Sequence, residues 1–91
     1  MEKEHYKLCL YIAGNTQKAE RAIANLKKIA AAELNGKFTI EIIDLLEHPQ
    51  LAAGEQIIAV PTLIKKLPAP LRVIVGDLSD KAKVLVGLNI V

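Results

Sequence analysis

The sequence predicts a mixed α/β fold in which strands and helices follow one another in the order β-α-β-α-β-β-α. The observations behind this prediction are a length of 91 residues, a hydrophobic share of 52%, and a spacing of apolar residues that alternates between strand-like and helix-like periods. This length suits one compact core and is short for two. We therefore expect residues 1–91 to form a single domain.

The chain begins with a predicted strand and a long predicted helix. Residues 6–13 (YKLCLYIA) are apolar and partly alternating, and Gly14-Asn15-Thr16 ends the run in a turn. From Thr16 onward the apolar residues recur every three or four positions, which places them on one helical face. They are Ala19, Ala22, Ile23, Leu26, Ile29, Ala30 and Leu34. Asn15 or Thr16 supplies the N-cap oxygen, and Asn35-Gly36 supplies the left-handed conformation that commonly closes a helix.

A second strand and a short helix follow. Residues 38–44 (FTIEIID) are rich in β-branched side chains. They predict a strand that pairs in parallel with the first across a right-handed connection. Pro49 is placed to open a short helix through residues 51–53, which Gly54 weakens.

The next segment predicts an antiparallel hairpin. Proline cannot donate to a sheet ladder, so Pro61 must precede a strand at residues 62–67 or lie at its edge. Residues 68–70 (PAP) force a turn, and residues 71–75 (LRVIV) return as the partner strand.

The C-terminal segment allows two interpretations. Ser79 is the predicted N-cap of a helix from Asp80 to about Val86, which completes the thioredoxin order of elements. However, residues 83–91 (KVLVGLNIV) are rich in β-branched side chains, and Gly87 interrupts a helix. Local preference and topology disagree here, as expected of a segment that is strained, functional or able to populate two packings.

Charge and composition exclude several classes of partner. Twelve Lys and Arg against ten Asp and Glu give a net charge of only +2, far below what phosphate-backbone binding usually needs. The charged residues 1–5 do not resemble a secretory signal, and no apolar run approaches the ~18 residues of a membrane span. The single Cys9 fits a reducing compartment. We therefore expect a cytoplasmic protein that binds neither nucleic acid nor membrane.

The thioredoxin order raises a redox hypothesis. That chemistry needs a reactive thiolate, usually in Cys-x-x-Cys, at the turn after the first strand. The turn is residues 13–16 (AGNT) and contains no cysteine. Cys9 lies inside the strand, where a buried apolar role is favoured, and a thiol-dependent enzyme using Cys9 is kept as the alternative. Pro61 stands where thioredoxins carry a cis proline, and we expect its role to be structural.

The other residues that often carry chemistry form no recognisable site. His5 and His48 lack the spacing of a zinc site. The carboxylates within residues 41–47 alternate across a strand, with no serine or histidine as partner. Gly14 and Gly76 lack the surrounding pattern of a phosphate-binding loop. We expect no catalytic residue, no metal and no cofactor.

Surface charge offers the remaining candidates. Lys65, Lys66 and Arg72 flank the predicted proline turn, and Arg21 lies on the polar face of the first helix. These four are the candidate partner-binding residues of a mildly basic patch, and a solvated charged face is the competing interpretation. A strand at the sheet edge could also pair with a partner strand.

Several stretches, taken together and in order, resemble the landmarks of the KaiB family over nearly the whole chain. They are 7–16 (KLCLYIAGNT), 43–45 (IDL) with 48–52 (HPQLA), 59–63 (AVPTL), 67–72 (LPAPLR) and 74–79 (IVGDLS). The resemblance implies a non-enzymatic regulator that binds a KaiC-type ATPase in a circadian-clock or clock-like stress-response system. Further implied partners are a KaiA-like protein and a clock-output histidine kinase.

The resemblance also implies two folds. One is a thioredoxin-like, partner-binding state, and the other is a self-associated tetramer or dimer in which residues 50–91 are rearranged. The candidate structural positions of this fold switch are Pro61, Pro68, Pro70, Gly87 and Asn89. Cyanobacterial members of the family carry an acidic tail beyond the position of Val91, so a role in a full oscillator with KaiA is left open. They often have a lysine where Gln56 stands, and this difference is expected to weaken or retune contacts with the partner. A sensor domain detached from a histidine kinase is the other alternative, since such a domain also looks like KaiB.

Overall fold

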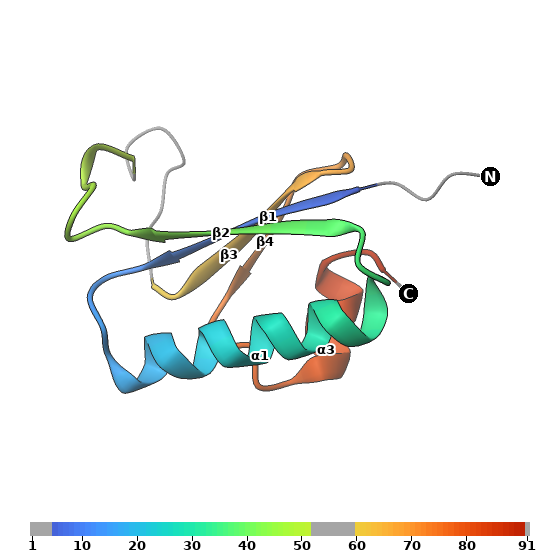
Figure 1. The fold of residues 1–91 in the computed structure, drawn as a ribbon, viewed down its shortest axis with the longest axis horizontal. Helices are drawn as coiled ribbons and strands as arrows, with labels where there is room; N and C mark the ends of the chain where they lie inside the picture. Colours follow the sequence, from blue (N-terminus) through green and yellow to red (C-terminus); the bar gives the residue numbers. More distant parts are fainter. Residues whose placement is uncertain (1–4, 52–59, 91) are drawn as a thin grey trace.

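The computed structural model describes residues 5–51 and 60–90, which form a sheet with helices packed on it (Figure 1). The elements are β1 (Tyr6–Ile12), α1 (Gln17–Glu33), β2 (Phe38–Asp44), β3 (Thr62–Leu67), β4 (Arg72–Val75) and α3 (Lys81–Gly87). The mixed α/β class is confirmed, and the strand ends agree with prediction to within one residue. The predicted short helix after Pro49 extends into residues 52–59, which lie outside the described residues.

The four strands form one sheet in the order β2-β1-β3-β4. β1 pairs in parallel with β2, as predicted for two strands joined through a helix. β3 is antiparallel to β1 and forms the predicted antiparallel hairpin with β4. The register between β1 and β3 shifts between Lys7 and Leu8, where an irregularity interrupts the ladder. Among the described strands, β2 and β4 are therefore the outer ones.

The main core lies between the sheet and helices α1 and α3, which cover the same face of it (Figure 1). Leu8, Leu10 and Leu63 are fully buried on this face of the strands. Leu26 of α1 and Leu88, directly after α3, pack into the same cluster. Burying one such side chain contributes about 1.5–3 kcal/mol, so this layer explains why the predicted apolar stripe of α1 faces the sheet.

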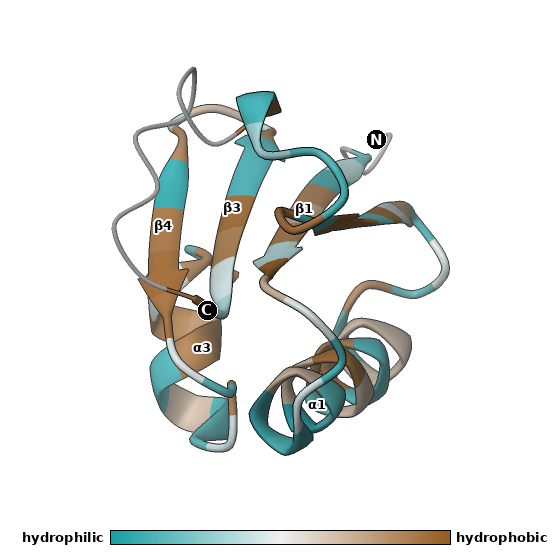
Figure 2. Cartoon of the chain, turned by 90° about the vertical axis from the view of Figure 1, so that its left-hand side faces the viewer, coloured by the Kyte–Doolittle hydropathy of each residue, from teal (hydrophilic) through white to brown (hydrophobic). Residues whose placement is uncertain are grey.

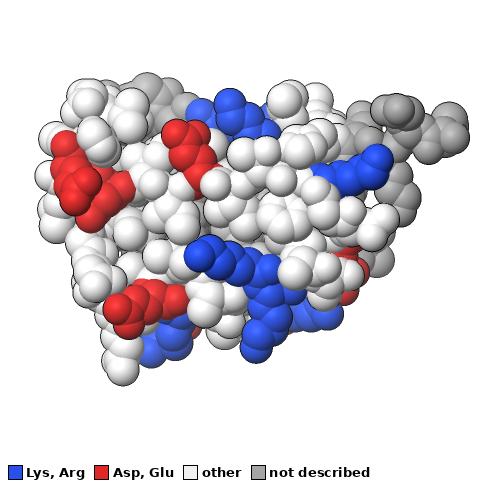
Figure 3. Space-filling view, in the orientation of Figure 1, with Lys and Arg blue, Asp and Glu red and all other residues white. Residues whose placement is uncertain are grey.

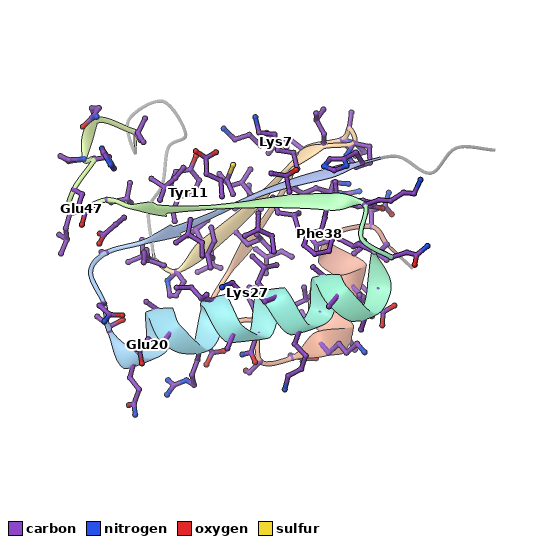
Figure 4. The ribbon with its side chains drawn as sticks, viewed as in Figure 1. Lys7, Tyr11, Glu20, Lys27, Phe38 and Glu47 are labelled. Atoms are coloured by element: carbon purple, nitrogen blue, oxygen red, sulfur yellow. The ribbon has the colours of Figure 1, made fainter. Side chains whose placement is uncertain are left out.

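A smaller cluster lies on the other face of the sheet. It contains Cys9, Tyr11, Ile43 and Ile64. Figure 4 shows Tyr11 on the side of the sheet away from α1 and Phe38 on the side toward it, which is the alternation expected of strands. Cys9 is 1% exposed, so the prediction of a buried cysteine is confirmed.

The caps of α1 follow the sequence closely. Thr16 is the N-cap, and its hydroxyl accepts a hydrogen bond from the N–H of Ala19 at 3.0 Å. At the other end Asn35 and Gly36 adopt the left-handed conformation, with φ of 52° and 77°. Both features confirm the prediction, and together they fix where the helix begins and ends.

The start of α3 differs from the prediction by one residue. Asp80, and not Ser79, is the N-cap, because the Asp80 carboxylate accepts from the N–H of Lys83 at 3.1 Å. The N–H of Ser79 instead donates to the carboxylate of Asp77 in the preceding turn. Two neighbouring side chains were both chemically suitable as caps, and the local turn decides between them.

The end of α3 is closed by a Schellman motif. Asn89 has a φ of 61°, its N–H donates to the carbonyl of Val86, and the N–H of Ile90 donates to the carbonyl of Leu85. Gly87 is the last residue of the helix, and a Cβ there would lie 2.8 Å from Cδ1 of Ile74. In this structure the ambivalent segment is therefore helical up to Gly87 and capped by Asn89.

The prolines occupy the predicted places. Pro61 directly precedes β3, and Pro68 and Pro70 lie in the turn between β3 and β4. The peptide bonds before all three are cis. Their part in a fold switch stays a prediction.

Candidate functional site

The turn between β1 and α1 is where a thioredoxin-like redox site would lie. Here the N–H of Gly14 donates to Asp44 Oδ1 at 3.0 Å, and the N–H of Leu46 donates to the same oxygen at 2.9 Å. These hydrogen bonds, the one from Gly14 above all, lower the pKa of Asp44. Gly14 has a φ of +80°, and a Cβ there would lie 2.9 Å from Leu46. The turn is held by backbone geometry and one carboxylate, and it carries no thiol.

A hollow of about 160 Å³ lies beside this turn. Its lining residues are Ile12, Ala13, Thr16, Lys18, Ala19, Val60 and Pro61. Lys18 is the one charged side chain among them, and no carboxylate, histidine or cysteine of the described residues faces it there. The residues that line this hollow therefore do not place a nucleophile next to a general base, as a catalytic site requires.

The described residues form neither a metal site nor a membrane-spanning helix. Within residues 5–51 and 60–90, no group of three His, Cys, Asp or Glu side chains lies close enough together to hold a metal ion. His5 is instead within 2.7 Å of the Thr39 hydroxyl. No helix in this part of the chain has the length and apolar character needed to cross a bilayer.

Lys65 does not lie on a basic surface patch. Its side chain is 1% exposed, and its Nζ is 5.8 Å from the centre of the Tyr6 ring, a cation–π geometry. Side chains alternate along β3, so Lys65 shares the helix-covered face with Leu63. The expectation that Lys65 is an exposed candidate is therefore wrong for this structure.

The remaining three candidates do not form one patch either. Arg21 Nε is 3.2 Å from Asp77 Oδ2, at the end of β4 that leads to α3. Arg72 is five residues earlier, at the other end of β4, which corresponds to about 16 Å of extended chain. Lys66 lies beside the proline turn with Arg72. In Figure 3 the cationic groups over the middle of α1 are likewise separated by uncharged surface from those along the top.

Arg21 is one of two α1 side chains that connect this helix to Asp77, in the loop after β4. Besides the ion pair, Asn25 Nδ2 donates to the carbonyl oxygen of Asp77 at 2.8 Å. Hydrogen bonds from the side chain and backbone of Ser79, with a further contribution from Arg21, lower the pKa of Asp77. No local sequence signal pairs these residues, because α1 and this loop are more than fifty positions apart.

The sequence interpretation missed an exposed apolar edge. Leu71, Val73 and Val75 are each more than half exposed, whereas Ile74 between them is buried. Figure 2 shows β4 as an apolar strand at the outside of the sheet. The alternation in LRVIV was the available signal, but it reveals two faces without telling which one is covered.

Known proteins match nearly the whole chain. The sequence model described as the KaiB domain matches residues 9–90. This chain belongs to the KaiB family. It is 50% identical over 88 residues to the circadian clock oscillator protein KaiB of Microcystis aeruginosa, covering 97% of this chain and 85% of that protein. The circadian clock oscillator protein KaiB1 of a Synechocystis strain is also 50% identical, with 97% and 84% covered.

Solved structures show the fold of this KaiB-family chain independently. The N-terminal domain of Synechococcus elongatus SasA aligns with a TM-score of 0.78 at 20% identity, covering 99% of this chain and 88% of that domain. Mitochondrial thioredoxin 3 of Saccharomyces cerevisiae aligns with a TM-score of 0.74 at 17% identity, covering 98% and 81%. The predicted thioredoxin-like fold is confirmed.

Proposed function

We propose that this KaiB-family chain is a non-enzymatic regulator that docks on a KaiC-type ATPase in a circadian-clock or clock-like stress-response system. The observation that carries the proposal is the 50% identity to clock oscillator proteins over 97% of the chain. The thiol-free turn at residues 13–16, held by Asp44, supports the non-enzymatic part.

The proposal includes a second, self-associated state. The thioredoxin-like fold is the docking form, and a tetramer or dimer with residues 50–91 rearranged withholds the docking surface. The mixed preferences of residues 83–91 support this part, since α3 spans only seven residues and ends at Gly87. Docking then selects the competent state, so the apparent dissociation constant rises as the population of that state falls.

The decisive experiment mixes the purified chain with the KaiC-type ATPase of the same organism. Size-exclusion chromatography after long incubation, with ATP or ADP, should show a stable complex. Arg72→Ala tests the exposed cation of the proline turn, and Lys27→Ala is the matched control, an exposed cation on α1. Complex formation weakened by Arg72→Ala alone supports the role of that cation. No complex under any nucleotide condition contradicts the proposed function.

Two alternatives have specific tests. A thiol-dependent enzyme requires Cys9, which is buried, so a disulfide-reductase activity that disappears in Cys9→Ser would favour it. A sensor domain detached from a histidine kinase is less favoured. The matched region covers 85% of a KaiB relative, so the remainder of that relative is too short to contain a kinase. A KaiA-like protein and a clock-output kinase are proposed as further partners, and the same chromatography tests each one.

A further inference from the structure

The outer strand β4 presents an apolar surface that nothing in the proposed function uses. We call it the β4 edge patch, and it comprises Leu71, Val73 and Val75. Their exposed fractions are 56%, 55% and 54%. Figure 2 shows this strand at the margin of the sheet. Val73 and Val75 lie on the face opposite to the buried Ile74, so their side chains form a row beside the open edge.

The hydrogen-bond pattern of the hairpin shows which backbone groups face outward. Gly76 N–H donates to the carbonyl of Pro61 at 2.9 Å, so this opposed pair is a hydrogen-bonded one. In an antiparallel ladder such pairs alternate with pairs whose backbone groups point away. The register opposes Ile74 to Leu63 and Arg72 to Lys65, which makes these the next bonded pairs. Val73 and Val75 therefore direct their N–H and C=O groups to the open edge.

The size of the patch argues against a second copy as its occupant. Its three side chains expose on the order of 300 Å² of apolar surface, a size at which exposed patches are often functional. Two copies that met on this patch would bury about 600 Å² of it, below the roughly 1,200 Å² of a stable protein interface. An extended segment follows the whole strand edge, so its backbone hydrogen bonds add to this apolar contact.

The charge beside the patch indicates the chemistry of the occupant. Arg72 is exposed at the start of β4, and none of the ion pairs found in the described part of the chain involves it. Asp77, at the other end, is already paired with Arg21 at 3.2 Å. The edge therefore offers a cation at one end and a neutralised carboxylate at the other.

We propose that the open edge of β4 binds an extended acidic peptide segment of a partner protein by strand addition. The segment pairs its backbone with Val73 and Val75, places alternate apolar side chains on the β4 edge patch, and directs a carboxylate to Arg72. Arg72 is shared with the proposed ATPase docking, whereas backbone pairing at Val73 and Val75 is not part of it. Peptide binding therefore tests this proposal, and complex formation with the ATPase tests the proposed function.

The first test measures backbone hydrogen exchange by NMR. The probe is an acetylated and amidated octapeptide of alternating valine and threonine with glutamate at both ends. A saturating amount should slow exchange of the Val73 and Val75 amides by at least about tenfold. The Ile74 amide, already bonded within the hairpin, should change little. The same peptide with lysine in place of both glutamates should bind more weakly.

Variants separate strand addition from simple apolar contact. Val73→Pro removes an outward N–H and leaves the ladder to β3 intact, so it should abolish peptide binding without unfolding the chain. Val75→Lys places a charge on the same edge and should also weaken peptide binding, so it replaces the proline variant if that variant does not fold. Val86→Lys is the matched control, because Val86 is 71% exposed on α3. Arg72→Glu should reverse the preference between the glutamate and lysine peptides.

Three results would overturn the proposal. One is that the exchange rates of the Val73 and Val75 amides do not change when the glutamate peptide is added, either because the peptide binds at another surface or because it does not bind. Another is equal loss of binding in Val75→Lys and Val86→Lys. The third is protection of both amides that grows with protein concentration in the absence of peptide, because that result identifies a second copy as the occupant.

Discussion

Replacing Leu88 with alanine tests how firmly α3 is docked. Leu88 is 1% exposed and packs in the main core directly after α3. Leucine-to-alanine changes at such sites cost about 3 kcal/mol, from lost burial and from the cavity left behind. In a domain of this size that loss lowers Tm by on the order of 12–24 °C. Urea titration followed by circular dichroism measures the free energy of unfolding directly.

Leu26→Ala is the matched comparison. Leu26 is also 1% exposed, but it belongs to α1 in the first half of the chain. Under the proposed fold switch, both states contain Leu26 in the same place, whereas only the thioredoxin-like state buries Leu88 beneath the sheet. Leu88→Ala should therefore weaken apparent affinity for the ATPase by about a hundredfold, and Leu26→Ala by much less. A Leu88→Ala cost below about 1 kcal/mol would refute the argument that α3 is packed as described.

Three further predictions concern caps and one carboxylate. Thr16→Ala removes the hydroxyl that caps α1 and should cost about 1 kcal/mol in urea titrations, with Thr16→Ser near the parent value; equal losses would contradict the cap. Asn89→Gly should be neutral or stabilising, because φ is 61° there, whereas Asn89→Val should lower Tm; the opposite order would show that α3 ends differently. Asp44 has a folded-state pKa below its ordinary value of 3.8, so its contribution is complete above that value and is lost as the pH falls through the folded pKa. Asp44→Asn should therefore flatten the acid limb of a stability profile from pH 2 to 7, and an unchanged limb would rule this contribution out.

Local signals predicted the elements of this fold well. Periodicity located β2 and β3 with the observed ends, and the Thr16 and Asn35-Gly36 caps fixed α1 because caps act within a few residues. The prediction of Ser79 as the N-cap of α3 was wrong. Ser79 and Asp80 are both good capping residues, and only the turn around Asp77 decides that Asp80 caps the helix.

Features that depend on distant contacts were not predictable in the same way. Lys65 is buried with its Nζ 5.8 Å from the centre of the Tyr6 ring, a contact between distant residues, and lysine is rarely found inside. The pairing of Arg21 with Asp77 joins residues 56 positions apart. For the same reason, the candidate basic patch separated into unconnected parts, while the apolar edge of β4 remained unnoticed.

The single oxygen of Asp44 that accepts from both Gly14 and Leu46 fixes the point at which the chain leaves β2. Because one atom serves the two loops, they cannot separate without losing a hydrogen bond to a charged group. In this structure the turn after β1 and the exit from β2 are therefore joined at one carboxylate, which sets where the chain departs toward the second half of the sheet.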